Sequence, residues 1–113
     1  MLIAVTGGTG YVGAHIVSAL LDSGHSVRLL IEPQWTNDDL AAPLTDRGPV
    51  TWVKGDVRDQ TTIEDLLDGC DAVLHAAGIV GTDDRLAQLM WEINAYASES
   101  VMRAAAARGL DPI

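Results

Sequence analysis

The sequence predicts an α/β fold in which a parallel sheet is covered by helices on both faces. Short apolar segments rich in Val, Ile and Leu alternate with segments whose apolar residues recur at steps of three or four. The first apolar segment, residues 2–6, runs directly into a glycine-rich turn and then into a helical pattern that begins near Tyr11. Because strands that alternate with helices pair in parallel, we expect a doubly wound parallel sheet.

Each element has local support in the sequence. In chain order we expect a strand at residues 2–6, a helix at 11–22, strands at 26–31 and 50–54, a helix at 61–67, a strand at 71–76 and a helix at 84–107. Gly24, Gly69 and Gly109 stand where the three helices end. Thr61 and Glu64 have the spacing of a capping box, with Thr61 as the N-cap of the second helix.

The last helix and the long connection are read from their composition. The helix carries one apolar stripe, formed by Leu86, Met90, Ile93, Ala97, Val101 and Ala104. Residues 33–49 hold three of the four prolines and show little periodicity, so we expect a loop with a helical turn at residues 38–42. Residues 111–113 lead toward a further strand.

Length, charge and cysteine content limit the classes of function. A chain of 113 residues with 48% apolar content can bury one core, so we expect a single domain over residues 1–113. The net charge of -9 argues against binding nucleic acid. The lone Cys70 excludes an internal disulfide. His15, His25 and His75 are too scattered to form a metal site, so we expect them to have surface or packing roles.

The sequence shows no sign of a membrane or secretory segment. No apolar run reaches the roughly 18 to 20 residues of a membrane span, and no basic leader precedes the first apolar residues. We therefore expect a cytoplasmic protein that does not contact a membrane.

The glycine-rich turn predicts a dinucleotide site. Gly7 lets the chain turn out of the strand, Gly10 lets the backbone approach phosphates, and Gly13 lets the next helix pack closely on the sheet. The helix then directs its free N–H groups at the phosphate oxygens. Two spacings fit, one that uses Gly8, Gly10 and Gly13 and one that uses Thr6, Gly7, Gly10 and Gly13. A plain glycine-rich turn is the alternative.

Glu32 is the candidate acid for the adenosine ribose. It ends the second strand, 19 residues after Gly13, close to the spacing at which an acid reaches the ribose hydroxyls. A carboxylate there repels a 2′-phosphate, which favours NAD over NADP. A solvated acid at the strand end, before Pro33, is the alternative.

Two later segments can also line a cofactor site. Asp56 and Val57 follow the third strand and can address the adenine edge, although the same residues also fit a plain polar loop. The small residues 76–78 after the fourth strand permit a flat cofactor to approach, although they equally suit tight packing. Asn94 stands on a packed helix face, so we expect it to bond a buried group, which can be backbone.

These motifs together resemble the short-chain dehydrogenase/reductase superfamily, and within it the extended branch, the NAD-dependent epimerase/dehydratase family. The resemblance rests on T-G-G-T-G-Y-V-G at residues 6–13, G-D-V-R-D at 55–59, H-A-A-G at 75–78 and Asn94, in that order. It spans essentially the whole chain, and it implies an NAD(P)-binding Rossmann-type domain.

The resemblance also implies roles for individual residues. Gly7, Gly10, Tyr11 and Val12 would line the pyrophosphate, Asp56 and Val57 the adenine, and Ala76, Ala77 and Gly78 the inner ribose and the nicotinamide side. Asn94 would help to order the active site. The relatives that prefer NAD have Asp at the position of Ile31, and many that prefer NADP have Arg at that of Glu32, so both cofactors stay open with NAD favoured.

The catalytic residues of the family are absent from the chain. The family uses a Ser or Thr and a Tyr-x-x-x-Lys pair, whose lysine lowers the pKa of the tyrosine. Here Tyr11 and Tyr96 are followed four residues later by His15 and Ser100, and the only lysine is Lys54. We therefore expect the cofactor-binding part of an oxidoreductase, epimerase or dehydratase, without turnover of its own. A non-catalytic NAD(P)-binding sensor or regulator is the alternative.

The resemblance implies that the chain stops where a fifth strand should begin. We therefore expect a fragment or shortened product with about four strands in the order 3-2-1-4. Its fourth strand would expose an apolar edge at Ala72, Val73 and Leu74, and we expect self-association through that edge.

Overall fold

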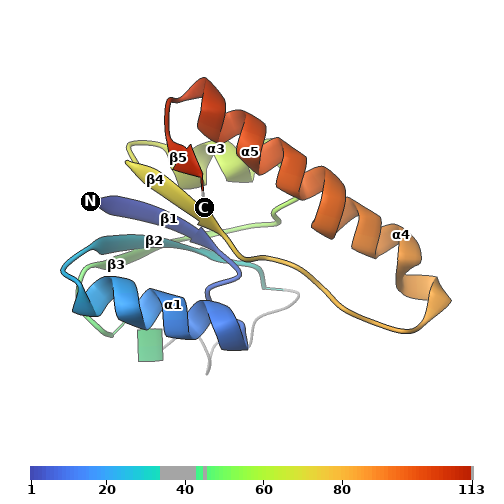
Figure 1. The fold of residues 1–113 in the computed structure, drawn as a ribbon, viewed down its shortest axis with the longest axis horizontal. Coiled ribbons are helices and arrows are strands. Elements are labelled where there is room, and N and C mark those ends of the chain that lie inside the picture. Colours follow the sequence, from blue (N-terminus) through green and yellow to red (C-terminus); the bar gives the residue numbers. More distant parts are fainter. Residues whose placement is uncertain (34–42, 45, 113) are drawn as a thin grey trace.

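The fold is a five-stranded parallel sheet between two helical layers (Figure 1). The computed structural model describes residues 1–33, 43–44 and 46–112. The strands are β1 (Leu2–Thr6), β2 (Ser26–Ile31), β3 (Val50–Lys54), β4 (Ala72–His75) and β5 (Asp111–Pro112), in the order β3-β2-β1-β4-β5. All four pairings between neighbours are parallel. The predicted α/β class with a doubly wound parallel sheet is confirmed.

The helices lie on opposite faces of this sheet. Helix α1 (Tyr11–Asp22) covers one face, and α3 (Gln60–Leu67) and α5 (Ser98–Ala107) cover the other (Figure 1). A long helical stretch leads into α5 and consists of η1 (Asp84–Leu86), α4 (Ala87–Met90) and the π-helical η2 (Trp91–Ala97). The described part of the chain contains no helix with the length and hydropathy of a membrane span.

Two cores form because alternate strand residues point to opposite faces. Ile3 and Val5 of β1 are buried on the α1 side, where Val17 meets them. Ala4 faces the other side and belongs to the cluster that holds Leu66 of α3. The sheet therefore has apolar contacts on both faces and holds its strand ends at a fixed edge.

The predicted order of the first four strands is confirmed, and the strand toward which residues 111–113 lead forms at Asp111–Pro112, so β4 is not the edge of the sheet. Gly109 takes a positive φ of 66°, and Leu110 N–H bonds the Ala105 carbonyl at 3.0 Å, so the chain reverses immediately after α5. Asp111 then pairs with Ala72 of β4. The expected exposed edge is consequently covered at Ala72 and at the residue that follows it.

The predicted capping box of α3 is also wrong. The helix begins at Gln60, and its N-cap is Asp59, whose carboxylate accepts the Thr61 N–H at 3.0 Å. Glu64 instead accepts a bond from the Gln60 side-chain amide at 3.1 Å. The carboxylate of Asp59, two residues before Thr61, takes the N-cap position, which leaves Thr61 inside the first turn.

The helix predicted at residues 84–107 has the expected limits but not uniform geometry. It opens with a 3₁₀ turn capped by Asp83, whose carboxylate accepts the Arg85 N–H at 2.9 Å, and it contains the π-helical η2. Apolar steps of three and four do not distinguish α from π geometry, so the sequence pattern missed the change. The helical turn predicted at residues 38–42 lies outside the described residues.

Candidate functional site

A cavity of about 310 Å³ lies at the carboxyl ends of β1, β2 and β4. Its lining comprises Gly7, Thr9, Gly10, Leu30, Glu32, Ala76, Ala77, Gly78, Ile79 and Ile93. Six of these were predicted as cofactor-binding residues, namely Gly7, Gly10, Glu32, Ala76, Ala77 and Gly78. The carboxyl edge of a parallel sheet is where α/β folds bind ligands.

The glycine turn is built around Gly7. Its φ is 70°, and a Cβ at this position would lie 2.5 Å from the backbone carbon and oxygen of Ala76. Gly10 N–H bonds the Gly7 carbonyl at 3.1 Å. A Cβ on Gly13 would lie only 2.0 Å from the same carbonyl oxygen, so the helix starts directly against the turn. The strand, the turn and the helix can meet here only without side chains.

The structure also distinguishes the two possible glycine spacings. Gly8 is buried, and a Cβ on it would lie 2.3 Å from Leu29 Cδ1, in the core and away from the cavity. Gly7 and Gly10 line the cavity instead. The spacing that starts at Thr6 and Gly7 therefore describes the turn.

Helix α1 presents an uncapped N-terminus beside this turn. Its N-cap is Gly10, and within the described residues no side-chain cap bond satisfies the first-turn N–H groups. Tyr11 and Val12 stand in that turn with exposed side chains, 85% and 65% accessible, and do not line the cavity. Any contact of these two residues with a phosphate would run through backbone N–H groups, a geometry that fits a pyrophosphate.

Glu32 is buried in the cavity wall. Its side chain is 8% exposed, and Oε2 accepts the Val57 N–H at 3.1 Å. Burial raises the pKa of Glu32, while the bond from Val57 acts in the opposite direction. The alternative of a solvated acid is therefore wrong, and Glu32 and Val57 meet although they lie in different loops.

Asp56 points into a different cavity. Its carboxylate pairs with Arg58 at 2.6 Å, and Arg58 also reaches Glu92 of η2 at 2.8 Å. The hydrogen bond from the Arg58 guanidinium holds the pKa of Asp56 below its usual range. This second cavity measures about 500 Å³ and is lined by Asp56, Arg58, Asp59, Glu92, Tyr96, Ala97 and Ser100. Of the predicted adenine pair, Val57 is joined to the first cavity by its bond to Glu32, and the negative charge of Asp56 helps to raise the pKa of Glu32.

The segment after β4 is held in place by Asn94. The Asn94 side chain accepts the Ile79 N–H at 2.9 Å and donates to the Ile79 carbonyl at 2.8 Å. A Cβ on Gly78 would lie 3.3 Å from Asn94 Oδ1. Asn94 bonds backbone, but the expectation of a buried partner on a packed face is wrong, because Asn94 is exposed and Ile79 is only partly buried.

Four lining residues were missed by the sequence analysis: Thr9, Leu30, Ile79 and Ile93. Leu30 stands two residues before Glu32, and strand alternation could have placed both on one face. Thr9 lies inside the glycine motif itself. Ile93 belongs to the apolar stripe that was assigned to the core, and nothing in its spacing distinguished it.

Relatives match almost the whole chain but only part of their own length. The chain is 36% identical over 110 residues to sterol demethylase protein B of Methylococcus capsulatus, covering 97% of this chain and 32% of that protein. It is 31% identical over 115 residues to 3 beta-hydroxysteroid dehydrogenase/Delta 5-->4-isomerase of Mycobacterium tuberculosis, covering 96% and 29%. The chain thus spans about a third of the length of these relatives.

Solved structures share the fold. A dTDP-glucose 4,6-dehydratase of Streptomyces venezuelae with NAD and TYD bound has a TM-score of 0.81 and 28% identity, covering 97% of this chain and 37% of that one. A UDP-glucose-4-epimerase of Stenotrophomonas maltophila with bound NAD and formylated UDP-arabinopyranose has a TM-score of 0.82 and 24% identity, covering 96% and 34%. The family model described as NAD dependent epimerase/dehydratase family matches residues 3–113. The chain therefore belongs to the NAD-dependent epimerase/dehydratase family of the short-chain dehydrogenase/reductase superfamily.

Proposed function

We propose that this chain is the dinucleotide-binding portion of an NAD-dependent oxidoreductase, epimerase or dehydratase that acts by hydride transfer. The observation that carries the proposal is the cavity at the strand ends, where Gly7 and Gly10 meet the uncapped start of α1 and Glu32 lies buried opposite. A closely approachable backbone, free helix amides and one buried acid are the features that a dinucleotide requires.

Each part of the cavity has a role in this proposal. Gly7, Gly10 and the first-turn amides of Tyr11 and Val12 hold the pyrophosphate, and Glu32 accepts bonds from the adenosine ribose hydroxyls. Asp56 and Val57 lie on the adenine side. Ala76, Ala77 and Gly78 form the wall toward the inner ribose and the nicotinamide, which accepts or returns the hydride. Support comes from the shared cavity lining and from the bond that joins Glu32 to Val57.

The preferred cofactor is NAD. The Glu32 carboxylate stands in the cavity wall, where a 2′-phosphate would meet its negative charge and its burial would limit screening by water. The solved neighbours named above contain NAD. The relatives named above carry the names of enzymes, so the alternative of a non-catalytic sensor has no support from them.

Calorimetric titration with NADH and NADPH tests the proposal. We expect saturable binding of NADH and weaker binding of NADPH. Glu32→Gln should weaken NADH binding by about tenfold, because a charged hydrogen bond contributes about 1.5–3 kcal/mol and Gln keeps part of it. The same substitution should also reduce the difference in affinity between NADH and NADPH.

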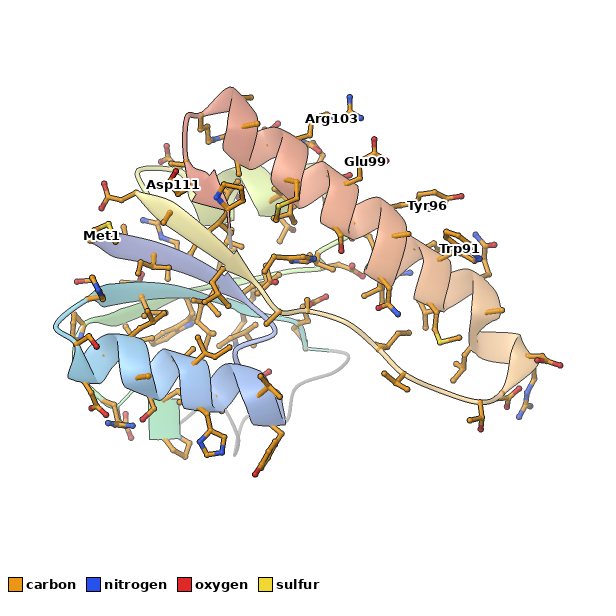
Figure 2. All side chains as sticks on the ribbon, viewed as in Figure 1. Met1, Trp91, Tyr96, Glu99, Arg103 and Asp111 are labelled. Atoms are coloured by element: carbon orange, nitrogen blue, oxygen red, sulfur yellow. The ribbon has the colours of Figure 1, made fainter. Side chains whose placement is uncertain are left out.

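The matched control is Glu99→Gln. Glu99 points outward from α5, away from the sheet (Figure 2), and lines neither cavity described above. Its substitution should leave both affinities unchanged. Folded wild-type protein that binds neither cofactor would refute the proposal, and equal effects of the two substitutions would refute the role of Glu32.

Self-association is a separate part of the proposal. Strand β5 pairs only with Ala72 and Val73, so it covers part of β4 and is itself a two-residue edge strand. Beyond Val73 the described part of β5 does not pair with β4, and an uncovered sheet edge offers backbone groups to another chain. Sedimentation velocity should show a concentration-dependent dimer, and a monomer at every concentration would contradict this.

A further inference from the structure

His75 at the end of β4 lies between two hydroxyl groups from distant parts of the chain. Its Nδ1 is 2.7 Å from Thr6 Oγ1 of β1, and its Nε2 is 2.8 Å from Ser98 Oγ of α5. Thr6 Oγ1 also accepts the Ala77 N–H at 3.2 Å, and Ser98 Oγ donates to the Asn94 carbonyl at 2.9 Å. These four bonds form one continuous chain from the cavity wall to the long helix.

The hydrogens in this chain can be assigned one by one. A hydroxyl has a single hydrogen to donate. The Ser98 hydrogen goes to the Asn94 carbonyl, so His75 Nε2–H must donate to Ser98 Oγ. Thr6 Oγ1 accepts from Ala77, so its own hydrogen is free to go to His75 Nδ1, which accepts it. When His75 is neutral and carries its hydrogen on Nε2, all four bonds form and the Thr6 hydroxyl hydrogen also has an acceptor.

The surroundings of this chain favour the same state. Thr6 is fully buried, with 0% of its surface exposed, and His75 is partly buried. A hydrogen on His75 Nδ1 would point at Thr6 Oγ1 and leave the Thr6 hydrogen without its acceptor. A buried polar group without a partner is costly, so the structure opposes that arrangement.

The bonded groups enclose the wall of the proposed dinucleotide cavity. Ala76, Ala77 and Gly78 line the cavity. The segment is fixed on one side by the bond from Ala77 to Thr6, and on the other by the two bonds between Asn94 and Ile79. Neither anchor uses a side chain of the wall itself.

We propose that His75, held as the neutral Nε2–H tautomer, is a positioning residue that fixes the 76–78 wall of the dinucleotide cavity by joining Thr6 to Ser98. This inference rests on the proposed function, because the wall matters for affinity only if the cavity takes a dinucleotide. His75 itself does not line the cavity and acts through the Ala77 backbone and the helix.

The first experiment needs no substitution. A two-bond ¹H–¹⁵N NMR spectrum of the wild-type chain reports which ring nitrogen of His75 carries the hydrogen. We expect a protonated Nε2, an unprotonated Nδ1 and slow solvent exchange of the Ala77 amide without cofactor. A hydrogen on Nδ1, or a rapidly exchanging Ala77 amide, would overturn the inference. If the wild-type chain does not bind NADH, the proposed function fails, while these two readouts still decide the inference about the wall.

The second experiment separates positioning from general stability. Thr6→Val keeps the shape but removes the hydroxyl, whereas Thr6→Ser keeps the hydroxyl. Titrated with NADH at a temperature where all are folded, Thr6→Val should bind about tenfold more weakly, equivalent to about 1.4 kcal/mol. Thr6→Ser should stay within about threefold of wild type, since the hydrogen bond is retained.

Two further comparisons complete the test. Ser98→Ala should weaken NADH binding, and Ser98→Thr should restore it, because only the hydroxyl is required. Thr51→Val, on the exposed side of β3, is the matched control and should have no effect on affinity. If Thr6→Val lowers the melting temperature but the folded protein binds NADH as tightly as wild type, His75 has only a structural role and the inference is wrong. If Thr6→Val does not fold, the inference is tested by the Ser98→Ala and Ser98→Thr variants and by the wild-type spectrum.

Discussion

Helix propensity and steric fit predict opposite results for Gly13→Ala. Gly13 lies in the first turn of α1, where replacing Gly by Ala normally stabilises a helix by about 1 kcal/mol. At this position, however, the new Cβ would lie 2.0 Å from the Gly7 carbonyl oxygen and 2.8 Å from Gly8 Cα. Ordinary contacts of a Cβ begin at 3.4 Å. We therefore predict that the substitution destabilises the protein.

The size of the effect follows from these distances. The start of α1 must move away from the turn by about 1.4 Å, the difference between 3.4 and 2.0 Å. The obstructing atoms at Gly7 and Gly8 are backbone, so no rotamer change can relieve the contact. Overpacking costs about 1–3 kcal/mol, and we take the upper value for a rigid backbone. After subtraction of the gain of about 1 kcal/mol in propensity, the expected loss is about 2 kcal/mol.

Urea denaturation of three proteins measures the effect. Wild type and Gly13→Ala are compared with Ala19→Gly, a substitution at an exposed position of the same helix. Ala19→Gly reports propensity alone and should cost about 1 kcal/mol. Titration should also show that Gly13→Ala binds NADH about tenfold or more weakly than wild type. Gly7 also accepts the Gly10 N–H, so a displacement at Gly7 displaces the whole turn.

One result would refute this reasoning. If Gly13→Ala is at least as stable as wild type while Ala19→Gly loses the expected amount, propensity dominates at both positions. The close approach of α1 to the turn would then be wrong, and with it the argument that a dinucleotide phosphate can approach this backbone. Loss of stability without loss of NADH affinity would confirm the steric argument and reject the link to binding.

Three further predictions test the elements around the cavity. Asp59→Ala should cost about 1 kcal/mol in urea denaturation as loss of an N-cap, while Thr61→Ala should cost less than about 0.5 kcal/mol; equal losses would restore Thr61 as the cap. Arg58→Met should lower the urea midpoint at low salt, and the difference from wild type should shrink at about 0.5 M NaCl, because its pairs with Asp56 and Glu92 are partly exposed; a difference independent of salt would contradict this. Burial lowers the pKa of the His75 imidazole in the folded protein below its ordinary value of 6.5. As the pH falls, the unfolded chain is therefore protonated before the folded protein. The contribution of the neutral imidazole to folding stability is complete above pH 6.5 and is lost as the pH falls toward the lower folded pKa. The urea midpoint of wild type minus that of a His75→Asn variant should therefore fall between about pH 8 and about pH 5.5, and a constant difference would argue against a buried neutral imidazole.

The elements could be predicted from the sequence because their signals are local. The predicted limits are confirmed for β1, β2, β3 and α1. The signals that set these limits, namely apolar runs, the glycine turn and Gly24, each lie within a few residues of the element. The order of the first four strands was expected from the doubly wound Rossmann topology, in which the fourth strand crosses over to lie beside the first. The glycine turn and Glu32 were found for the same reason, because their spacing encodes a local turn and the end of one strand.

The parts that were missed depend on contacts between distant residues. The sequence pointed to a further strand at residues 111–113, but it did not show that Asp111 and Pro112 pair with β4 and cover part of the edge expected to be exposed. The ion pair between Asp56 and Arg58 was not predicted, and Arg58 is itself held by Glu92 from a helix 34 residues later. The adenine role of Asp56 stays a prediction. No short-range pattern contains the information that Arg58 reaches η2.

The long helix is the common anchor for the loops around the proposed site. Glu92 of η2 holds Arg58 in the loop after β3, and Asn94 holds Ile79 in the segment after β4. Ser98, at the start of α5, holds His75. In contrast, Trp91 projects from the outer side of the same helix (Figure 2), where it is 60% exposed.

The π-helical segment η2 lies where the long helix contacts these loops. Three polar side chains, at positions 92, 94 and 98, each bond a loop or a strand end at the carboxyl edge of the sheet. Local π segments often occur where a helix serves a site, and here the one in η2 coincides with the contacts that hold the cavity walls.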